Sequence, residues 1–193
     1  PDPRVTAAMR PSLTLFFIVE PPKYESLACY LAASIRQHLD PDIALVGYCP
    51  AHRMHEVDPA VAETLRRLRC DLRPIDTDDA FDPPYPHGNK ILACMQPRDT
   101  AWGGFLDSDI LFLRPHDISR FLRPGHVACS VAASIRWAPP DLWQAAYGAF
   151  GLPVPQERVT LMRQKTPQVA PYFSSGFVLF PEAAADGFAA TWL

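Results

Sequence analysis

Short apolar segments alternate with amphipathic segments through the first half of the chain. Residues 13–19 form a nearly continuous run of apolar strand formers, which is typical of a strand buried on both faces of a parallel sheet. Residues 24–39 change period, because leucine or isoleucine recurs every fourth position from Leu27 to Leu39. This spacing predicts an amphipathic helix. The alternation favours a fold in which helices cover a sheet of mostly parallel strands.

The same alternation continues to residue 113. We expect the following elements: a strand at 43–49, a helix at 60–68, a weaker strand at 71–76, a loop at 77–86, a short helix at 88–95 and a strong strand at 104–113. Strands and helices in this order predict an α/β sandwich with right-handed crossovers. In such a fold, ligands bind at the carboxyl ends of the strands.

Beyond residue 113 the pattern is looser. Two helices and two strands are predicted, at 118–122 and 142–150 and at 126–132 and 172–180, respectively. Neither a repeat nor a linker divides the 193 residues, so we expect a single domain over 1–193 with one hydrophobic core. The sequence stops within a predicted helix, which is the pattern expected of a domain that continues downstream.

Composition and charge argue against several classes of protein. The formal net charge of −3 disfavours a dedicated nucleic-acid-binding domain, which usually presents a basic face. No apolar run reaches the ~20 residues needed to cross a bilayer, and no signal-peptide pattern is visible in the sequence. The five cysteines are far apart and lie in apolar segments. We therefore expect reduced core thiols in a cytoplasmic protein.

Two aspartates interrupt the apolar strand predicted at 104–113. In extended chain, Asp107 and Asp109 point to the same side, with Cα atoms roughly 6.5 Å apart. No Lys or Arg stands nearby in sequence until Arg114, and burial of two unpaired carboxylates is costly. A divalent cation such as Mg²⁺ or Mn²⁺ removes that cost and keeps positions open for phosphate oxygens. The alternative is that Asp-Ser-Asp forms a polar turn, because both residue types favour turns.

The segment Phe105-Leu-Asp-Ser-Asp-Ile-Leu-Phe112 resembles the DxD motif of the GT-A-fold glycosyltransferases, in which an apolar strand delivers two metal-facing aspartates. Three further segments are similar to parts of that family: Thr14–Glu20 to its first strand, Asn89–Leu92 to the short helix before the motif, and Tyr172–Phe180 to a late strand containing a glycine. Together they cover roughly residues 13–181. The resemblance implies a Rossmann-like three-layer sandwich with a mixed, mostly parallel central sheet.

The resemblance also implies roles for individual residues. Asp107 and Asp109, with Ser108 between them, would hold Mn²⁺ or Mg²⁺ and, through it, the donor diphosphate. The other implied donor contacts are the backbone at Val19 and Glu20 for the base, Asp76 for the base or ribose, Lys90 for a phosphate, and Ser174, Ser175 and Gly176 for the sugar. Two of these have plainer alternatives, since Asp76 also fits an ordinary turn and Lys90 a solvent-facing helical position.

Some features depart from the family pattern. Many members carry Asn at the position of Ser174, and several use a late histidine as a metal ligand, whereas no histidine follows His126 here. No catalytic base is evident. Glu182 and Asp186 stand in a suitable place, but Glu182 also fits an ordinary acid in the first turn of a helix.

The sequence thus predicts a metal-dependent glycosyltransferase that moves a sugar from a nucleotide-diphosphate donor, a UDP-sugar, to an acceptor that the sequence does not specify. One alternative is a glycosyltransferase-like module that binds without turnover. A weaker alternative is a phosphatase of the haloacid-dehalogenase type, whose motif requires Thr or Val where this chain has Leu111. The pair His52 and His55 is interpreted as part of a solvated loop, since helical zinc pairs are usually spaced by four residues.

Overall fold

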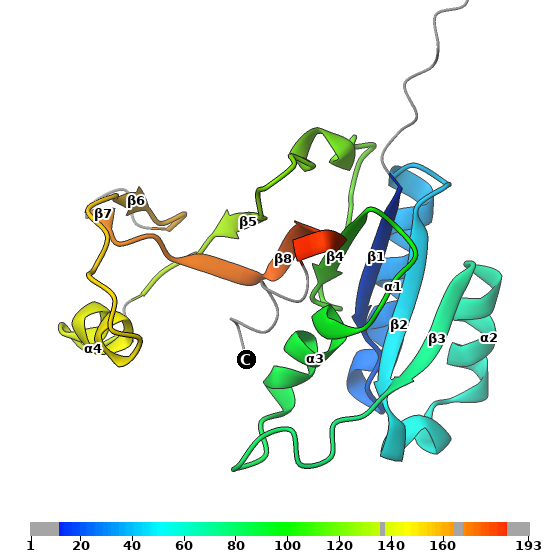
Figure 1. Cartoon of the computed structure of the whole chain (residues 1–193). Helices are drawn as coiled ribbons and strands as arrows, with labels where there is room; N and C mark the ends of the chain where they lie inside the picture. Colours follow the sequence, from blue (N-terminus) through cyan, green and yellow to red (C-terminus); the bar gives the residue numbers. More distant parts are fainter. Residues whose placement is uncertain (1–11, 136–137, 164–167, 185–193) are drawn as a thin grey trace, which may run out of the picture. The chain divides into compact units, whose positions relative to one another are not determined.

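The computed structural model describes residues 12–135, 138–163 and 168–184. Its contacts divide into two compact units, the first formed by residues 1–128 and 178–193 and the second by residues 129–177. Figure 1 shows the elements of both units along the chain. The interpretation of 1–193 as a single domain stays a prediction.

The first unit contains the alternating elements that the sequence predicts. In chain order these are β1 (Leu13–Ile18), α1 (Lys23–His38), β2 (Ala44–Pro50), a 3-10 helix (Ala51–Glu56), α2 (Pro59–Arg67), β3 (Cys70–Ile75), a 3-10 turn (Pro86–Gly88), α3 (Asn89–Met95), β4 (Trp102–Leu106), a 3-10 helix (Ile118–Phe121), the end of β8 (Phe173–Pro181) and a 3-10 turn (Glu182–Ala184). The periodicity of the hydrophobic residues therefore predicted the bounds of these helices and strands to within a few residues, and β4 is the main exception.

The strand order in the main sheet is β3-β2-β1-β4-β8-β5. The three pairs β1–β2, β1–β4 and β2–β3 are parallel. At the far side of β4, the Glu182 amide donates to the Ala101 carbonyl at 3.0 Å, and a Cβ built on Gly103 or Gly104 would meet Phe180 or Leu179, respectively. These contacts run in opposite chain directions, so β8 lies antiparallel to β4. The expected mixed, mostly parallel sheet is confirmed.

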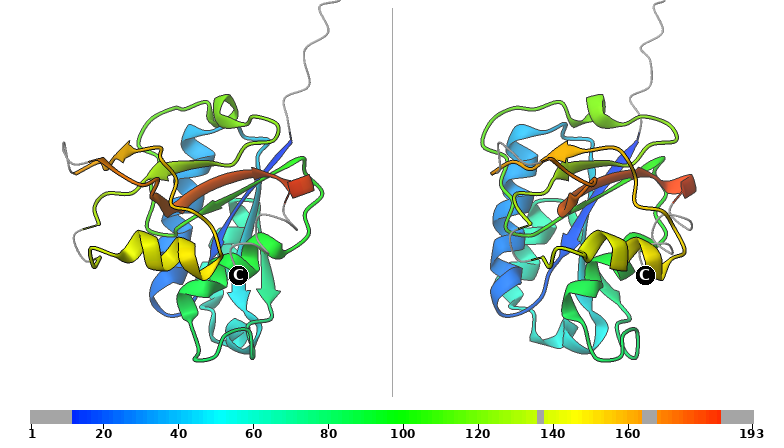
Figure 2. Two further views of the ribbon diagram at one scale, coloured as in Figure 1. Left: turned by 60° about the vertical axis from the view of Figure 1, so that its left-hand side comes forward. Right: turned by 90° about the vertical axis from the view of Figure 1, so that its left-hand side faces the viewer.

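Helices cover both faces of the parallel strands. The chain steps outward from β1 through β2 to β3 and then returns past β1 to form β4. Because right-handed crossovers are the rule, α1 and α2 lie on one face and α3 on the other, as Figures 1 and 2 show. The α/β sandwich with three layers is thus confirmed.

An aromatic cluster forms the core on the α3 face. Phe16 in β1 makes edge contacts with Tyr48, Phe105 and Phe180, with ring centroids 5.9–6.2 Å apart. On the opposite face Leu31 of α1 is fully buried. Burial of each of these large side chains contributes about 1.5–3 kcal/mol to the stability of the fold. The strands that carry them are therefore firmly held.

The prediction of one strand over 104–113 is wrong. β4 ends at Leu106, because the Ile110 amide donates to the Asp107 carbonyl at 3.1 Å and closes a turn. The apolar residues that follow do not enter the sheet, and Leu111 and Leu113 are 50% and 82% exposed.

The second unit holds β5 (Ala128–Val131), α4 (Leu142–Ala149), the antiparallel pair β6 (Val159–Thr160) and β7 (Gln168–Val169), and the first part of β8. The sequence predicted β5, α4 and β8 but not the short β6–β7 pair. No residue of α4 is fully buried. Within the described residues, no helix of either unit is long and apolar enough to cross a membrane.

Candidate functional site

The site lies at the ends of two adjacent parallel strands, β1 and β4. In the strand order, β2 and β3 follow on the side of β1, whereas β8 and β5 follow on the side of β4. A crevice at the carboxyl ends of such strands is where α/β folds bind ligands. Here a cleft of about 240 Å³ opens, lined by Ile18, Glu20, Tyr24, Pro86, His87, Lys90, Phe105, Asp107, Ser108 and Asp109.

Residues 107–110, the acidic turn, form one wall of this cleft. The buried Ser108 hydroxyl donates to the Ile18 carbonyl at 2.5 Å and so ties the turn to the end of β1. Asp107 is half-buried and Asp109 is exposed. The expectation that both aspartates extend from one strand is wrong, because the backbone turns at this point, and the geometry is that of the alternative, a polar turn.

A lysine from α3 compensates one of the two aspartates. The Lys90 ammonium lies 2.8 Å from Asp107 Oδ1 and 5.4 Å from the centroid of the Phe105 ring. Both carboxylates were expected to be unpaired because no Lys or Arg is near them in sequence, but the crossover through α3 brings a lysine from 17 residues earlier to Asp107. The Asp109 side chain forms no hydrogen bond or ion pair with any described residue, and its charge faces the cleft uncompensated.

Glu20 joins this cleft to a second one. Its carboxylate accepts from Arg53 Nη1 at 2.9 Å, and Arg53 also binds Glu56. The adjoining cleft, of about 300 Å³, lies beyond the ends of β2 and β3 and shares Glu20 and Pro86 with the first. Across it, His52 Nδ1 lies 3.3 Å from Asp78 Oδ1. The edge of the sheet thus offers two connected hollows with a carboxylate between them.

The other predicted donor contacts lie elsewhere. Val19 is buried and its amide donates to the Tyr48 carbonyl, while Asp76 is exposed and accepts from the Asp78 amide in a local turn. Neither lines the two clefts. Ser175 and Gly176 belong to the second unit, where the Gly176 amide donates to Ser174 Oγ at 3.3 Å. Their roles in donor binding stay predictions.

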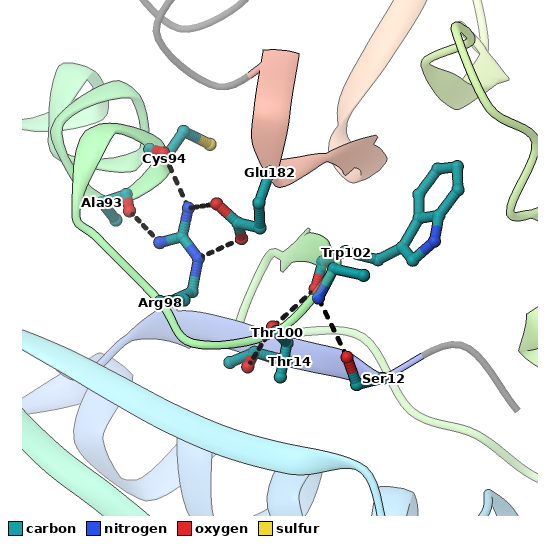
Figure 3. A network of polar contacts seen from close by, with 9 residues as sticks. Ser12, Thr14, Ala93, Cys94, Arg98, Thr100, Trp102 and Glu182 are labelled. Carbon is teal, nitrogen blue, oxygen red and sulfur yellow. Dashed lines mark hydrogen bonds and ion pairs between the residues drawn. The ribbon is translucent and has the colours of Figure 1, made fainter. Parts of the chain in front are cut away.

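Glu182 has a structural partner. Its carboxylate accepts from Arg98 Nε at 2.6 Å (Figure 3), and the Arg98 side chain is only 1% exposed. Glu182 does stand in the first turn of a 3-10 helix, as predicted, and its charge is in addition bound to a buried guanidinium. Asp186 lies outside the described residues.

Three residues at the site were not predicted. Tyr24 and His87 line the first cleft and carry no local signal that distinguishes them from surface residues. Arg53 lines neither cleft but binds Glu20, and it follows a strand that already ends in proline. All three enter the site because α1, the turn before α3 and the 3-10 helix after β2 meet at the same edge of the sheet. The predicted order of strands and helices was sufficient to locate the edge of the sheet where ligands bind, but it did not identify the side chains that lie there.

The donor set fits a cation that is shared with a ligand. Among the described residues, no group of three or more His, Cys, Asp or Glu side chains could hold a metal ion. Mg²⁺ and similar hard cations, however, are commonly bound by one or two carboxylates together with water and substrate phosphates. Asp107 and Asp109 provide such a pair, so the residues fit a phosphate-bound cation and do not form a metal centre of their own.

Comparisons with known proteins agree with this architecture. The chain has the fold of LgtC. The match to the crystal structure of an active-site mutant of LgtC has a TM-score of 0.57 and 16% identity, and it covers 88% of this chain and 57% of that one. It also matches the ligand-free bifunctional glycosyltransferase WbbM, with a TM-score of 0.54, 14% identity and coverage of 96% and 34%. The chain thus spans little more than half of LgtC and a third of WbbM.

At these identities the likeness shows the fold alone, which is that of the GT-A glycosyltransferases. No curated protein sequence matches the chain significantly. The sequence model of the Rhodobacterales glycosyltransferase domain, in contrast, matches residues 15–193. The chain therefore belongs to the Rhodobacterales glycosyltransferase domain family.

Proposed function

We propose that this domain binds the diphosphate of a UDP-sugar in the cleft at the carboxyl ends of β1 and β4 and transfers the sugar to an acceptor. Asp107 and Asp109 would hold Mn²⁺ or Mg²⁺ there, and the cation would offset the charge that develops on the leaving diphosphate. The observation that carries the proposal is the exposed, uncompensated Asp109 beside the Lys90–Asp107 pair.

The charge balance of the cleft supports a role for a cation. Its lining side chains include three carboxylates, on Glu20, Asp107 and Asp109, but only one ammonium, on Lys90. Arg53 and Lys90 compensate the first two carboxylates. A diphosphate brings further negative charge, which Asp109 would repel within a few ångströms. A divalent cation between them reverses the sign of that interaction.

The two connected hollows suggest how the rest of the donor is placed. With the diphosphate at the acidic turn, the nucleoside would extend into the cleft at the ends of β2 and β3, and Glu20 would lie between the two parts. The Glu20 carboxylate accepts hydrogen bonds and suits a hydroxyl or N–H donor of the nucleoside. The sugar would then extend from the other end of the diphosphate, away from this pocket.

Titration calorimetry with UDP tests the proposal. We expect UDP to bind in the presence of MnCl₂ and to lose measurable affinity when EDTA replaces the metal, because the repulsion from Asp109 is restored. Asp109→Asn removes the charge with little change in shape and should weaken metal-dependent binding. The matched control is Asp71→Asn, which alters an exposed ion pair with Arg73 on β3. Equal affinity with and without metal would refute the proposed role of the acidic turn.

A second candidate function is ligand binding without turnover. This candidate is favoured because Glu182, one of the two acids that could serve as the catalytic base, has its carboxylate bound to Arg98. Release of UDP from a panel of UDP-sugars with Mn²⁺ distinguishes the two. Steady release that Asp109→Asn abolishes identifies the transferase, whereas binding without release identifies the module.

A further inference from the structure

Arg98 is a buried cation that joins three elements of the first unit. It stands in the connection between α3 and β4, and its Nη1 and Nη2 donate to the carbonyls of Ala93 and Cys94, each at 2.8 Å. Nε and Nη2 bind the two oxygens of Glu182 at 2.6 and 3.2 Å. The guanidinium also lies 4.1 Å from the centroid of the Phe16 ring in β1. Figure 3 shows the hydrogen bonds to Ala93, Cys94 and Glu182 converging on this one side chain.

The two carbonyls belong to the end of a helix that needs outside support. α3 has only seven residues, and helices of that length are unstable without tertiary contacts. The carbonyls of a helix's last turn lack the usual backbone partners, and in α3 the Gln96 backbone amide reaches only the Ala93 carbonyl, at a long 3.3 Å. Arg98 donates to the carbonyls of Ala93 and Cys94 and, through Glu182, fixes the end of α3 to the end of β8.

The same helix carries the lysine of the cleft. Lys90 and Cys94 are four residues apart and thus lie on one side of α3, about one turn from each other. A rigid-body shift of this short helix therefore displaces Lys90 together with the last turn. Its ammonium lies 2.8 Å from Asp107, a contact that tolerates little displacement.

We propose that Arg98 and Glu182 are positioning residues, which hold the last turn of α3 so that Lys90 stays in contact with Asp107. Neither residue lines the cleft. Their effect on it passes through α3, because loss of the pair removes a constraint on the end of the helix that carries Lys90.

A substitution at Gly103 tests this ion pair independently. A Cβ on Gly103 would lie 2.3 Å from Glu182 Oε1 and 3.1 Å from the Phe180 ring. Gly103→Ala therefore pushes the carboxylate from its place while both charges of the pair are kept. A matched control exists on α2, where Glu63 forms exposed ion pairs with Arg66 and Arg67. Glu63→Gln makes the same chemical change as Glu182→Gln at a site away from α3.

Nitrogen-15 NMR of the lysine ammonium groups tests the proposal without any ligand. The chain has only three lysines, Lys23, Lys90 and Lys165, so the Lys90 signal is identified by its absence in Lys90→Met. We expect Asp107→Asn to shift or broaden this signal, and Glu182→Gln to do the same although it touches neither group. Glu63→Gln should leave it unchanged. An unchanged Lys90 signal in folded Glu182→Gln would overturn the proposal. If Glu182→Gln does not fold, an unchanged Lys90 signal in Gly103→Ala would overturn it instead.

The effect on donor binding rests on the proposed function. With Mn²⁺ present, Glu182→Gln should raise the Kd for UDP about tenfold but should add less than about twofold in a Lys90→Met background, because the two residues act in one chain of contacts. Full additivity would overturn the proposal. If the unaltered protein does not bind UDP at all, the proposed function fails, and the NMR result alone decides whether Arg98 and Glu182 position Lys90.

Discussion

The two ends of α3 carry ion pairs that differ in their access to water. At the first turn, Lys90 meets Asp107, with side chains 17% and 37% exposed. Beyond the last turn, Arg98 meets Glu182, with side chains 1% and 14% exposed. Each pair joins the helix region to a residue that follows a strand, but the first opens on a cleft and the second is enclosed by aromatic rings.

This difference separates an exchangeable contact from a permanent one. A pair that faces water loses little when a ligand replaces one partner, because solvent already screens the charges. A buried pair leaves an uncompensated charge when either partner is removed. The open pair is therefore suited to binding and the enclosed pair to fixing the helix, and the predictions below separate these roles.

The largest effect is expected at the enclosed pair. Glu182→Ala leaves the Arg98 guanidinium buried without its counter-ion and should lower the free energy of unfolding by about 3–5 kcal/mol. Urea denaturation followed by circular dichroism measures this loss. A loss below about 1 kcal/mol would show that the two ends of α3 do not differ in the way their burial indicates.

The next effect concerns binding at the open end. Asp109→Ala removes the uncompensated carboxylate and should weaken Mn²⁺-dependent UDP binding by roughly a hundredfold, by analogy with the loss of groups that support a bound metal. The free energy of unfolding should change by less than about 0.5 kcal/mol, because the side chain is exposed. Calorimetry and urea denaturation on the same preparation compare the two quantities, and a large loss of stability would argue that Asp109 supports the fold.

A smaller loss of stability is expected when a methyl group is added next to the enclosed ion pair. Gly103→Ala inserts a methyl group against Glu182 and Phe180 and should cost about 1–3 kcal/mol, the usual range for overpacking. Gly148→Ala is the control, because a Cβ at that position of α4 meets nothing within 4 Å. If both variants unfold at the same urea concentration as the unaltered protein, the tight packing around Glu182 is not present in solution.

The smallest change in stability is expected for the lysine of the cleft. Lys90→Met keeps most of the apolar stem over Phe105 and should alter the free energy of unfolding by less than about 1 kcal/mol, since Asp107 remains solvated. Thermal denaturation checks this value. A loss as large as that of Glu182→Ala would make the two pairs equivalent and remove the distinction between them.

The elements before β4 could be predicted because their burial has a regular period. Parallel strands covered on both faces give continuous apolar runs, and α1 gives a repeat near four residues. The same logic failed at residues 110–113, where apolar side chains were interpreted as buried although Leu113 is 82% exposed. Composition alone does not show that the backbone turns at Asp107.

The position of Asp107 and Asp109 in the fold could also be predicted, but the ion pairs around them could not. Asp107 and Asp109 were expected at the carboxyl edge of the sheet, and the structure places them at the cleft there. The contact of Lys90 with Asp107 spans 17 residues and that of Arg98 with Glu182 spans 84. Such contacts depend on which crossover places which helix on which face, and local spacing carries no signal for them.

The bond from Ser108 to the Ile18 carbonyl joins two parts of the chain that are 90 residues apart. It fixes the acidic turn to the last residue of β1, two positions before Glu20, so the walls of the two hollows share one backbone anchor. Ser108→Ala would remove that anchor.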